Sequence, residues 1–444
     1  MGVSTTAAQH VVRPLSPSER WFWIIDRISP SNCTARVRVH GWLTPERLDR
    51  AGAALVAEYP LLRVGVEHGD GFDPRFVRLR EPRIPVRRVV AAGGDAWRPE
   101  VDAEIREPFD TASGMARLVD IAHGVGTPDE FHDVVLTVSH VIVDGRSAMS
   151  LLRKVIEYAA EEVEPVSRAA VPPADDLIPA GARGFWRYLY TTLYDQVVAL
   201  VRRPRLLSGA TQVPLPERLT RVVHRKLDAR ELAALVADCR TAGVTVHGAL
   251  AGAVALAIGK MVRPSGSGVT GIGSPVDFRH SLTPAPSVDE LGIYAPVITN
   301  FVRFGGRETL WSAARSVNRQ VHRGVRQRRH LATVAGMRYG TPRSLESGWR
   351  LVELIDRRAP WNVSVTNLGR IDFPDRVGEW RTSDLTFAAG NSCVSAVTIA
   401  ITTAHGETHI EFCYVEGALS ADGAERFADL VVTTLAERPD PARV

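Results

Sequence analysis

Cysteine is scarce in this chain of 444 residues, and the few cysteines are not arranged for chemistry. Cys33, Cys239, Cys393 and Cys413 form no CxxC pair and have no spacing typical of a metal site. We therefore expect free thiols in a reducing compartment, and neither a disulfide framework nor a zinc cluster.

Lysine is rarer still, so arginine supplies almost all of the positive charge. The net charge is only +4, and no nucleic-acid-binding module or basic stripe with interleaved aromatics is present, so no nucleic-acid partner is expected. One arginine cluster, residues 326–330, could contact phosphates or an acidic partner. A solvated helix end is the more ordinary interpretation of that cluster.

Long apolar runs are also missing. The longest, residues 244–261, is interrupted by His247, three glycines and Lys260, which indicates a buried helix and not a membrane span. The N-terminus has no apolar segment of the secretory type. These absences predict a cytoplasmic protein without a membrane span.

The composition is otherwise that of a globular protein, with 45% hydrophobic and 23% charged residues. The length favours two domains of roughly 200 residues. Strands and helices are mixed in both halves without regular alternation, which predicts α/β layers with a mixed sheet in each. A Pro-, Ala- and acid-rich stretch over 161–179 marks a linker. The aromatic segment 185–200 after it is interpreted as a helix packed at a domain seam or lining an acyl pocket, and membrane-surface binding is a less favoured alternative.

The strongest candidate for chemistry is the segment 140–145, His-Val-Ile-Val-Asp-Gly. It closes an apolar run typical of a buried strand and precedes a helix predicted to begin near Ser147. A strand end fixes a side chain in space, and histidine is suited to moving a proton at neutral pH. Gly145 permits a tight turn and a close approach of backbone to ligand. The pattern predicts a catalytic base at His140, and a buried structural histidine is the alternative.

Two later segments offer partners for this base. Arg279 ends the strand-like segment 275–279 and could hold the Asp144 carboxylate. Asn367 follows the predicted strand 362–366, where its amide could face a developing oxyanion.

Rival sites are weak. The chain has no GxSxG elbow and no Walker loop. His405 and His409 flank a predicted hairpin without an evident acidic third ligand, so zinc is not expected. The glycines of 266–273 precede a strand, whereas a dinucleotide loop follows one, so we interpret them as a surface turn.

These residues carry a family resemblance. His140, Asp144 and Gly145 resemble the second His, the Asp and the Gly of the HHxxxDG motif of the chloramphenicol-acetyltransferase-like superfamily, which includes condensation domains. Segments 15–19, 242–250, 275–279 and 367–369 are similar to the start, central helix, PVDLR strand and (S/T)NxG turn of that superfamily. In particular, the chain resembles stand-alone phthiocerol/phthiodiolone dimycocerosyl transferase-like acyltransferases, which are associated with polyketides.

The resemblance implies an α/β fold of two chloramphenicol-acetyltransferase-like lobes, each a mixed sheet with flanking helices, with a tunnel at their interface. The expected boundaries are 1–162 for the lobe that carries the motif, 163–220 for a linker and bridging helix, and 221–444 for the second lobe.

It also implies transfer of an acyl group from a thioester, on a carrier protein or coenzyme A, to an alcohol or amine acceptor in natural-product or lipid biosynthesis. His140 would be the general base, Asp144 a structural residue held by Arg279, and Gly145 N–H and Asn367 the oxyanion donors. The phosphopantetheine thioester would be a co-substrate, with no permanently bound cofactor, no metal and a monomeric chain. The alternatives are an enzyme that cyclises, condenses or epimerises a carrier-tethered intermediate, and a non-catalytic module that recruits carrier proteins.

The chain departs from the superfamily pattern in two places. Ser139 stands where the motif has its first His, and the DFGWG motif of the plant enzymes is missing. Because side chains alternate along a strand, Ser139 is expected to face away from His140, so its presence should not abolish the chemistry.

Overall fold

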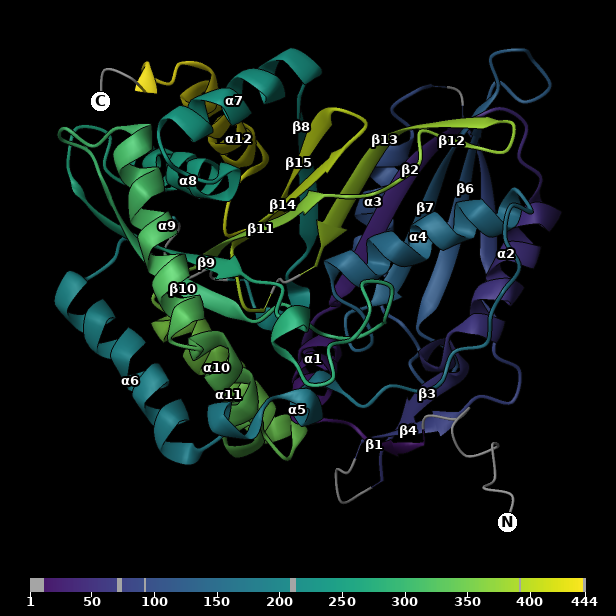
Figure 1. Cartoon of the computed structure of the whole chain (residues 1–444), viewed down its shortest axis with the longest axis horizontal. Helices are drawn as coiled ribbons and strands as arrows, with labels where there is room; N and C mark the ends of the chain where they lie inside the picture. Colours follow the sequence, from purple (N-terminus) through teal and green to yellow (C-terminus); the bar gives the residue numbers. More distant parts are fainter. Residues whose placement is uncertain (1–11, 70–73, 92, 208–212, 391–392, 442–444) are drawn as a thin grey trace.

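The computed structural model describes residues 12–69, 74–91, 93–207, 213–390 and 393–441 and consists of two lobes side by side (Figure 1). Each lobe is built on a six-stranded sheet that contains both parallel and antiparallel neighbours. Helices flank both sheets (Figure 1). The predicted α/β fold of two lobes, each a mixed sheet with flanking helices, is confirmed.

The sheet of the first lobe has the order β12-β13-β2-β7-β6-β5. Helices α2 and α4 cover one face and α3 covers the other, so the central strand β7 is buried on both sides and can be apolar almost throughout. The bounds are β2 (Asn32–His40), β5 (Val86–Ala91), β6 (Ala116–His123), β7 (Phe131–Ser139), β12 (Arg376–Val377), β13 (Trp380–Ala389), α2 (Pro45–Glu58), α3 (Trp97–Arg106) and α4 (Gly145–Ala159).

Two of these strands come from the far end of the chain. β13 pairs antiparallel with β2, and β12 pairs with β13, so residues 376–389 complete the sheet of the first lobe. The sequence prediction assigned all of 221–444 to the second lobe, because a pairing between segments more than 300 residues apart leaves no local pattern. The boundaries 1–162, 163–220 and 221–444 otherwise stay predictions, and residues 1–11 lie outside the described part of the chain.

The sheet of the second lobe has the order β10-β9-β11-β14-β15-β8. Helix α8 packs on this sheet, and α9 and α12 pack against α8. The bounds are β8 (Thr220–Leu227), β9 (Gly268–Pro275), β10 (Val297–Phe304), β11 (Val363–Arg370), β14 (Val397–Ala404), β15 (Glu407–Val415), α7 (Ala229–Thr241), α8 (Val246–Val262), α9 (Leu310–Arg326) and α12 (Ala421–Ala436).

Helix α8 is the buried helix expected from the interrupted apolar run. A Cβ added to Gly252 would lie 2.9 Å from the backbone nitrogen of Ala314 on α9, so glycine permits the close contact between these helices. In the described part of the chain, no single helix is long and apolar enough to cross a membrane. The pair α7 and α8, bent by 98°, meets that test only when the two helices are taken together.

The glycine-rich segment 266–273 was interpreted as a surface turn, and this interpretation is wrong from residue 268 onward. Residues 268–273 form most of β9, which lies in the interior of the sheet between β10 and β11. A Cβ on Gly273 would lie 3.1 Å from the Trp361 ring, so small residues are needed where this aromatic side chain covers the strand.

The remaining elements join or border the lobes. Helix α1 starts at the capping residue Ser16, whose hydroxyl accepts from the Glu19 N–H at 3.3 Å while the Glu19 carboxylate accepts from the Ser16 N–H at 2.7 Å. The bounds are α1 (Pro17–Ile28), α5 (Ala174–Leu177), α6 (Phe185–Arg202), α10 (Arg329–Gly340), α11 (Leu345–Arg358) and a small sheet of β1 (Arg13–Pro14), β4 (Arg75–Arg78) and β3 (Val64–Glu67), with 3₁₀ turns at Pro60–Arg63, Ala180–Ala182, Leu215–Glu217 and Arg279–Ser281.

Candidate active site

His140 lies directly after the last residue of β7, at the seam between the lobes. Its backbone N–H donates to the Ser31 carbonyl at 3.0 Å, which holds the main chain. Its ring stacks on Phe22 of α1, with the ring centroids 3.9 Å apart and the planes 25° from parallel. The position of the imidazole is therefore fixed at both the backbone and the ring.

The hydrogen bond of the His140 ring sets its tautomer. Nδ1 lies 2.7 Å from the Val143 carbonyl oxygen, which can only accept, so Nδ1 carries the proton and the neutral ring keeps its lone pair on Nε2. Burial lowers the pKa of His140, and the nearby Asp144 carboxylate opposes this only in part. The ring is thus neutral at pH 7, with Nε2 available as a base.

Asp144 is the N-cap of α4 and is fully engaged in hydrogen bonds. Its Oδ1 accepts from the Ser147 N–H at 2.8 Å and from Nη2 of Arg279 at 3.0 Å, and its Oδ2 accepts from the Tyr294 N–H at 3.0 Å. Arg279 Nη2 also donates to the Ser147 hydroxyl at 2.8 Å. The structure therefore places Asp144 and Arg279 in contact, and this contact ties the motif to the second lobe.

Both members of this ion pair are buried. Burial alone would raise the pKa of Asp144, but the Arg279 guanidinium and the hydrogen bonds from Ser147 outweigh it and lower that pKa below its usual value. The guanidinium of Arg279 also lies over the Tyr294 ring, 4.1 Å from its centroid. The carboxylate stays charged and acts as a structural acceptor.

A cavity of about 260 Å³ opens beside His140. Its walls come from both lobes and are mainly apolar, with a group of hydroxyls on one side. The lining residues are Trp21, Phe22, Ile25, His140, Asp144, Gly145, Pro275, Ala295, Val297, Ile355, Trp361, Ser364, Thr366, Phe387, Ala389, Val394, Ser395 and Thr398. The cavity is consistent with an acyl site at the seam, while a tunnel open at both ends stays a prediction.

Gly145 begins α4 and lies against strands from the far end of the chain. A Cβ at this position would lie 2.7 Å from Cδ2 of Leu368 and 3.0 Å from Cε1 of Phe387, so only glycine fits. The first N–H groups of a helix lack intrahelical acceptors and carry a positive partial charge. The start of α4 therefore presents a donor end at the cavity wall.

Asn367 is not brought into the cavity. Its Oδ1 accepts from the Gly369 N–H at 2.8 Å and so caps the local turn, and Asn367 is absent from the described cavity wall. Side chains alternate along β11, which turns Ser364 and Thr366 toward the cavity and Asn367 away from it. The structure therefore does not place Asn367 at the cavity wall, and its role as an oxyanion donor stays a prediction.

The Ser and Thr hydroxyls that line one side of the cavity were not predicted from the sequence. The Ser395 and Thr398 hydroxyl oxygens lie 2.9 Å apart, and the Ser364 hydroxyl donates to Thr398 at 3.2 Å. The two-residue spacing of Ser364 and Thr366 was the available signal.

Ser139 is buried and is not part of the described cavity wall. Its hydroxyl accepts from the Val141 N–H at 3.4 Å. This agrees with a side chain that points away from His140.

His409 has no evident acidic partner in the sequence around the predicted hairpin, but two carboxylates lie near it in the structure. One ligand atom each of Asp384, Glu407 and His409 lies within 4.8 Å of the others. The Lys226 ammonium lies 2.7 Å from Glu407 and 3.7 Å from Asp384, so a cation already balances the carboxylates. His405 instead contacts the Phe373 carbonyl at 3.0 Å. None of these residues lines the cavity beside His140.

Comparison with known proteins gives matches to both sequence and fold. Residues 216–412 match the family described as phthiocerol/phthiodiolone dimycocerosyl transferase C-terminus. A plipastatin synthase of Bacillus subtilis (strain 168) is 26% identical over 148 residues, which are 32% of this chain and 6% of that protein. The chain thus spans only a small part of the curated relatives it matches, between 4% and 6% of their length.

The fold matches extend over nearly the whole chain. The first condensation domain of the calcium-dependent antibiotic synthetase, in complex with a substrate analogue, has a TM-score of 0.73 at 15% identity, with 96% of each chain covered. The trichothecene 15-O-acetyltransferase of Fusarium sporotrichioides has a TM-score of 0.72 at 15% identity, with 99% of this chain and 98% of that chain covered. The chain has the fold of the chloramphenicol-acetyltransferase-like condensation superfamily. The fold predicted from the family resemblance is thereby confirmed, and the match of residues 216–412 to a transferase family agrees with the predicted enzyme class.

Proposed function

We propose that this condensation-superfamily chain is an acyltransferase that moves an acyl group from a thioester to an alcohol or amine by direct attack. One observation carries the proposal. His140 holds its Nδ1 proton on the Val143 carbonyl, which leaves a basic Nε2 beside a cavity walled by both lobes. The match to a transferase family supports the same reaction class.

The chemistry requires one proton transfer in each direction. His140 Nε2 takes the proton from the acceptor O–H or N–H as that atom attacks the thioester carbonyl carbon. The tetrahedral intermediate collapses with cleavage of the carbon–sulfur bond, and the imidazolium returns the proton to the departing thiolate. An ester or amide and a free thiol result, without a covalent acyl-enzyme. Holding both substrates in one cavity supplies the proximity contribution to the rate.

The negative charge on the carbonyl oxygen needs a donor in the intermediate. The start of α4 at Gly145 would meet this need, because Gly145 lines the cavity and the first N–H groups of a helix lack intrahelical acceptors and carry a positive partial charge. Asp144 and Arg279 serve as positioning residues, which hold the motif in shape without touching the reacting atoms.

The acyl donor in this proposal is a phosphopantetheine thioester on a carrier protein or coenzyme A, used as a co-substrate. The mainly apolar wall suits an acyl chain. The mechanism uses no metal and no resident cofactor. A monomeric state and a cytoplasmic location stay predictions.

The test is an intact-mass analysis of products from a panel of acyl thioesters, on coenzyme A and on a carrier protein, with alcohol and amine acceptors. We expect the acceptor to gain the mass of the acyl group. His140→Ala should lower turnover by about 10²–10⁴-fold. His322→Ala, which removes an exposed histidine of α9, is the matched control and should keep full turnover. Near-normal turnover of a folded His140→Ala variant would remove His140 as the base.

The same experiment separates the alternatives. An epimerase leaves the mass of the tethered intermediate unchanged and alters only its stereochemistry, and a cyclase lowers the mass by that of water or of the released carrier. A recruiting module binds the carrier protein without turnover of any thioester. Any of these outcomes in place of acceptor acylation would overturn the transfer proposal.

A further inference from the structure

Helix α6 lies along the outer side of the second lobe and packs there with one face only (Figure 1). On that face Tyr188 lies against Gly336 and Gly340 of α10, and Thr191 is the buried residue of the helix. The rest of this 18-residue helix is largely open to solvent.

The open face of α6 is apolar. At 100° per residue, its most exposed large side chains fall within a sector of about 100°, and the sector runs about 22 Å along the helix. Exposure reaches 78% at Trp186 and is still 51% at Leu193. We call this set the apolar stripe; it consists of Trp186, Tyr190, Leu193, Val197, Leu200 and Val201. A continuous exposed apolar surface of this kind marks an interaction site.

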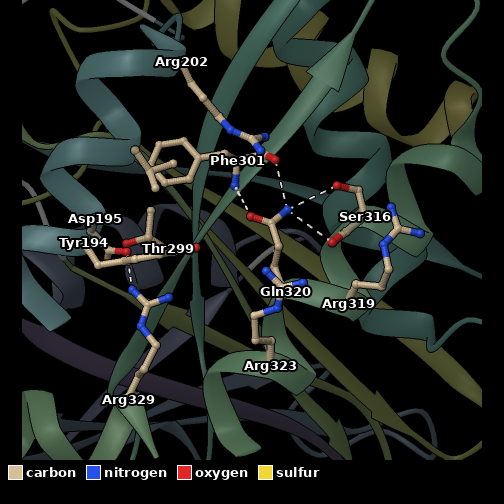
Figure 2. A pocket seen from close by; sticks show the side chains of 11 residues that line it. Tyr194, Asp195, Arg202, Thr299, Phe301, Ser316, Arg319, Gln320, Arg323 and Arg329 are labelled. Atoms are coloured by element: carbon tan, nitrogen blue, oxygen red, sulfur yellow. Dashed lines mark hydrogen bonds and ion pairs between the residues drawn. The ribbon is translucent and has the colours of Figure 1, made fainter. Parts of the chain in front are cut away.

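Arginines line the groove between α6 and the neighbouring helices, along one edge of the stripe. They surround two hollows, of about 200 Å³ and 490 Å³, which share Arg329. Figure 2 shows the first hollow, with guanidinium groups from α6, α9 and α10 arranged around it. We call this set the arginine row; it consists of Arg187, Arg202, Arg319, Arg323, Arg326, Arg328 and Arg329.

The arginine row carries a large excess of positive charge. Arg329 forms an ion pair with Asp195 and lies over the Tyr194 ring, 4.4 Å from its centroid. Among the described residues, the other members of the row have no acidic partner, and Asp195 is the one carboxylate that lines either hollow. The remaining floor is neutral, with Gln320 bonded to the backbone of Phe301.

We propose that the apolar stripe and the arginine row dock this protein onto an anionic lipid bilayer. The stripe would enter the boundary between headgroups and acyl chains, where tryptophan and tyrosine are favoured, and the arginines would contact lipid phosphates. An anionic bilayer provides an apolar interior and dense negative charge at one surface. The apolar stripe matches the interior, and the arginine row matches the negative charge.

Charge argues against the other occupants. A second copy of the chain that docked through the same face would bring the same seven arginines with one carboxylate, so its charge would repel this face. Free phosphate could fill the hollows but leaves the stripe in water. The proposal is independent of the acyl-transfer chemistry, because neither set lines the cavity beside His140.

The experiment is flotation of the full chain with vesicles of phosphatidylcholine alone and of phosphatidylcholine mixed with phosphatidylglycerol. We expect binding to the anionic vesicles only, weakened by salt and only slightly by inorganic phosphate. Arg319→Gln with Arg323→Gln should weaken binding by about fivefold per arginine. Trp186→Ser with Val197→Ser should weaken it by about tenfold or more.

Matched controls leave this face untouched. Trp42→Ser removes an exposed tryptophan of the first lobe, and Arg230→Gln with Arg240→Gln removes two exposed arginines of α7. Both controls should bind vesicles like the unaltered chain, and circular dichroism should show all variants folded. Equal binding to both vesicle types, or full binding by the Trp186 and Val197 variant, would overturn the proposal. Capture of an acidic carrier protein without vesicle binding, or a dimer lost on changing the stripe, would overturn it as well.

Discussion

Replacing Arg279 with Met should destabilise the folded chain while leaving the volume of the side chain nearly unchanged. The guanidinium is the charge partner of Asp144, and both groups are buried. Removal of one partner of a buried pair costs about 3–5 kcal/mol, because the other charge stays buried and uncompensated. Asp144 would keep its bonds from the Ser147 and Tyr294 N–H groups, which do not neutralise its charge.

The double variant Asp144→Asn with Arg279→Met tests this cause. It removes both charges, while the Asn carbonyl oxygen can still accept from one of the two backbone N–H groups. If the stranded charge is the origin of the loss, the double variant should be more stable than Arg279→Met alone, although two substitutions are present. Urea unfolding followed by tryptophan fluorescence and circular dichroism gives both free energies.

The pH dependence follows from the lowered pKa of Asp144. A carboxyl group whose pKa is lower in the folded state contributes stability that is fully present above its unfolded pKa of about 3.9 and is lost as the pH falls through the folded value. Without Arg279, burial raises the folded pKa instead, so the deficit of Arg279→Met should shrink on acidification. A loss of less than about 0.5 kcal/mol for Arg279→Met, or a deficit that does not change with pH, would refute the reasoning.

Three further outcomes are expected. Gly145→Ala should cost about 1–3 kcal/mol of stability and much of the activity, because its Cβ meets Leu368 and Phe387, whereas Gly181→Ala, with open space around it, should be neutral in the same unfolding assay. Asn367→Ala should keep most of the turnover and lose about 1 kcal/mol of stability from its bond to Gly369; a loss of turnover above tenfold in a folded variant would restore it as an oxyanion donor. Turnover should be flat around pH 7 and fall only below the ordinary histidine range, because burial lowers the pKa of His140; a midpoint at or above pH 6.5 in a rate profile would contradict this.

Local signals in the sequence were enough for much of the fold. The interrupted apolar run over 244–261 predicted the buried helix α8, and the apolar run before His140 predicted β7. The pairing of β13 with β2 was beyond reach, because it depends on contacts more than 300 residues apart. The glycines of β9 were misread for a similar reason, since the Trp361 ring that requires them is distant in sequence.

The site residues also differ in whether local sequence was enough to predict them. His140, Asp144 and Gly145 lie within six residues, so their pattern was visible. The contact of Arg279 with Asp144 was anticipated from chemistry, since a buried carboxylate needs a cation. The place of Asn367 could not be predicted in the same way, because alternation along β11 and its bond to the Gly369 N–H hold it away from the cavity wall.

The conformation of the segment 140–145 also depends on contacts from the second lobe, in addition to the strand and the helix that flank it. Asp144 caps α4, and its carboxylate is held by Arg279 and by the backbone of Tyr294, which both belong to the second lobe. Val143, whose carbonyl orients the His140 ring, directly precedes this capping residue. A shift of the lobes would therefore disturb the tautomer-setting bond of the base together with the cavity wall. In the proposed mechanism, a base held in this way is most effective when both lobes are in place around the substrates, which would link catalytic competence to the arrangement of the whole molecule.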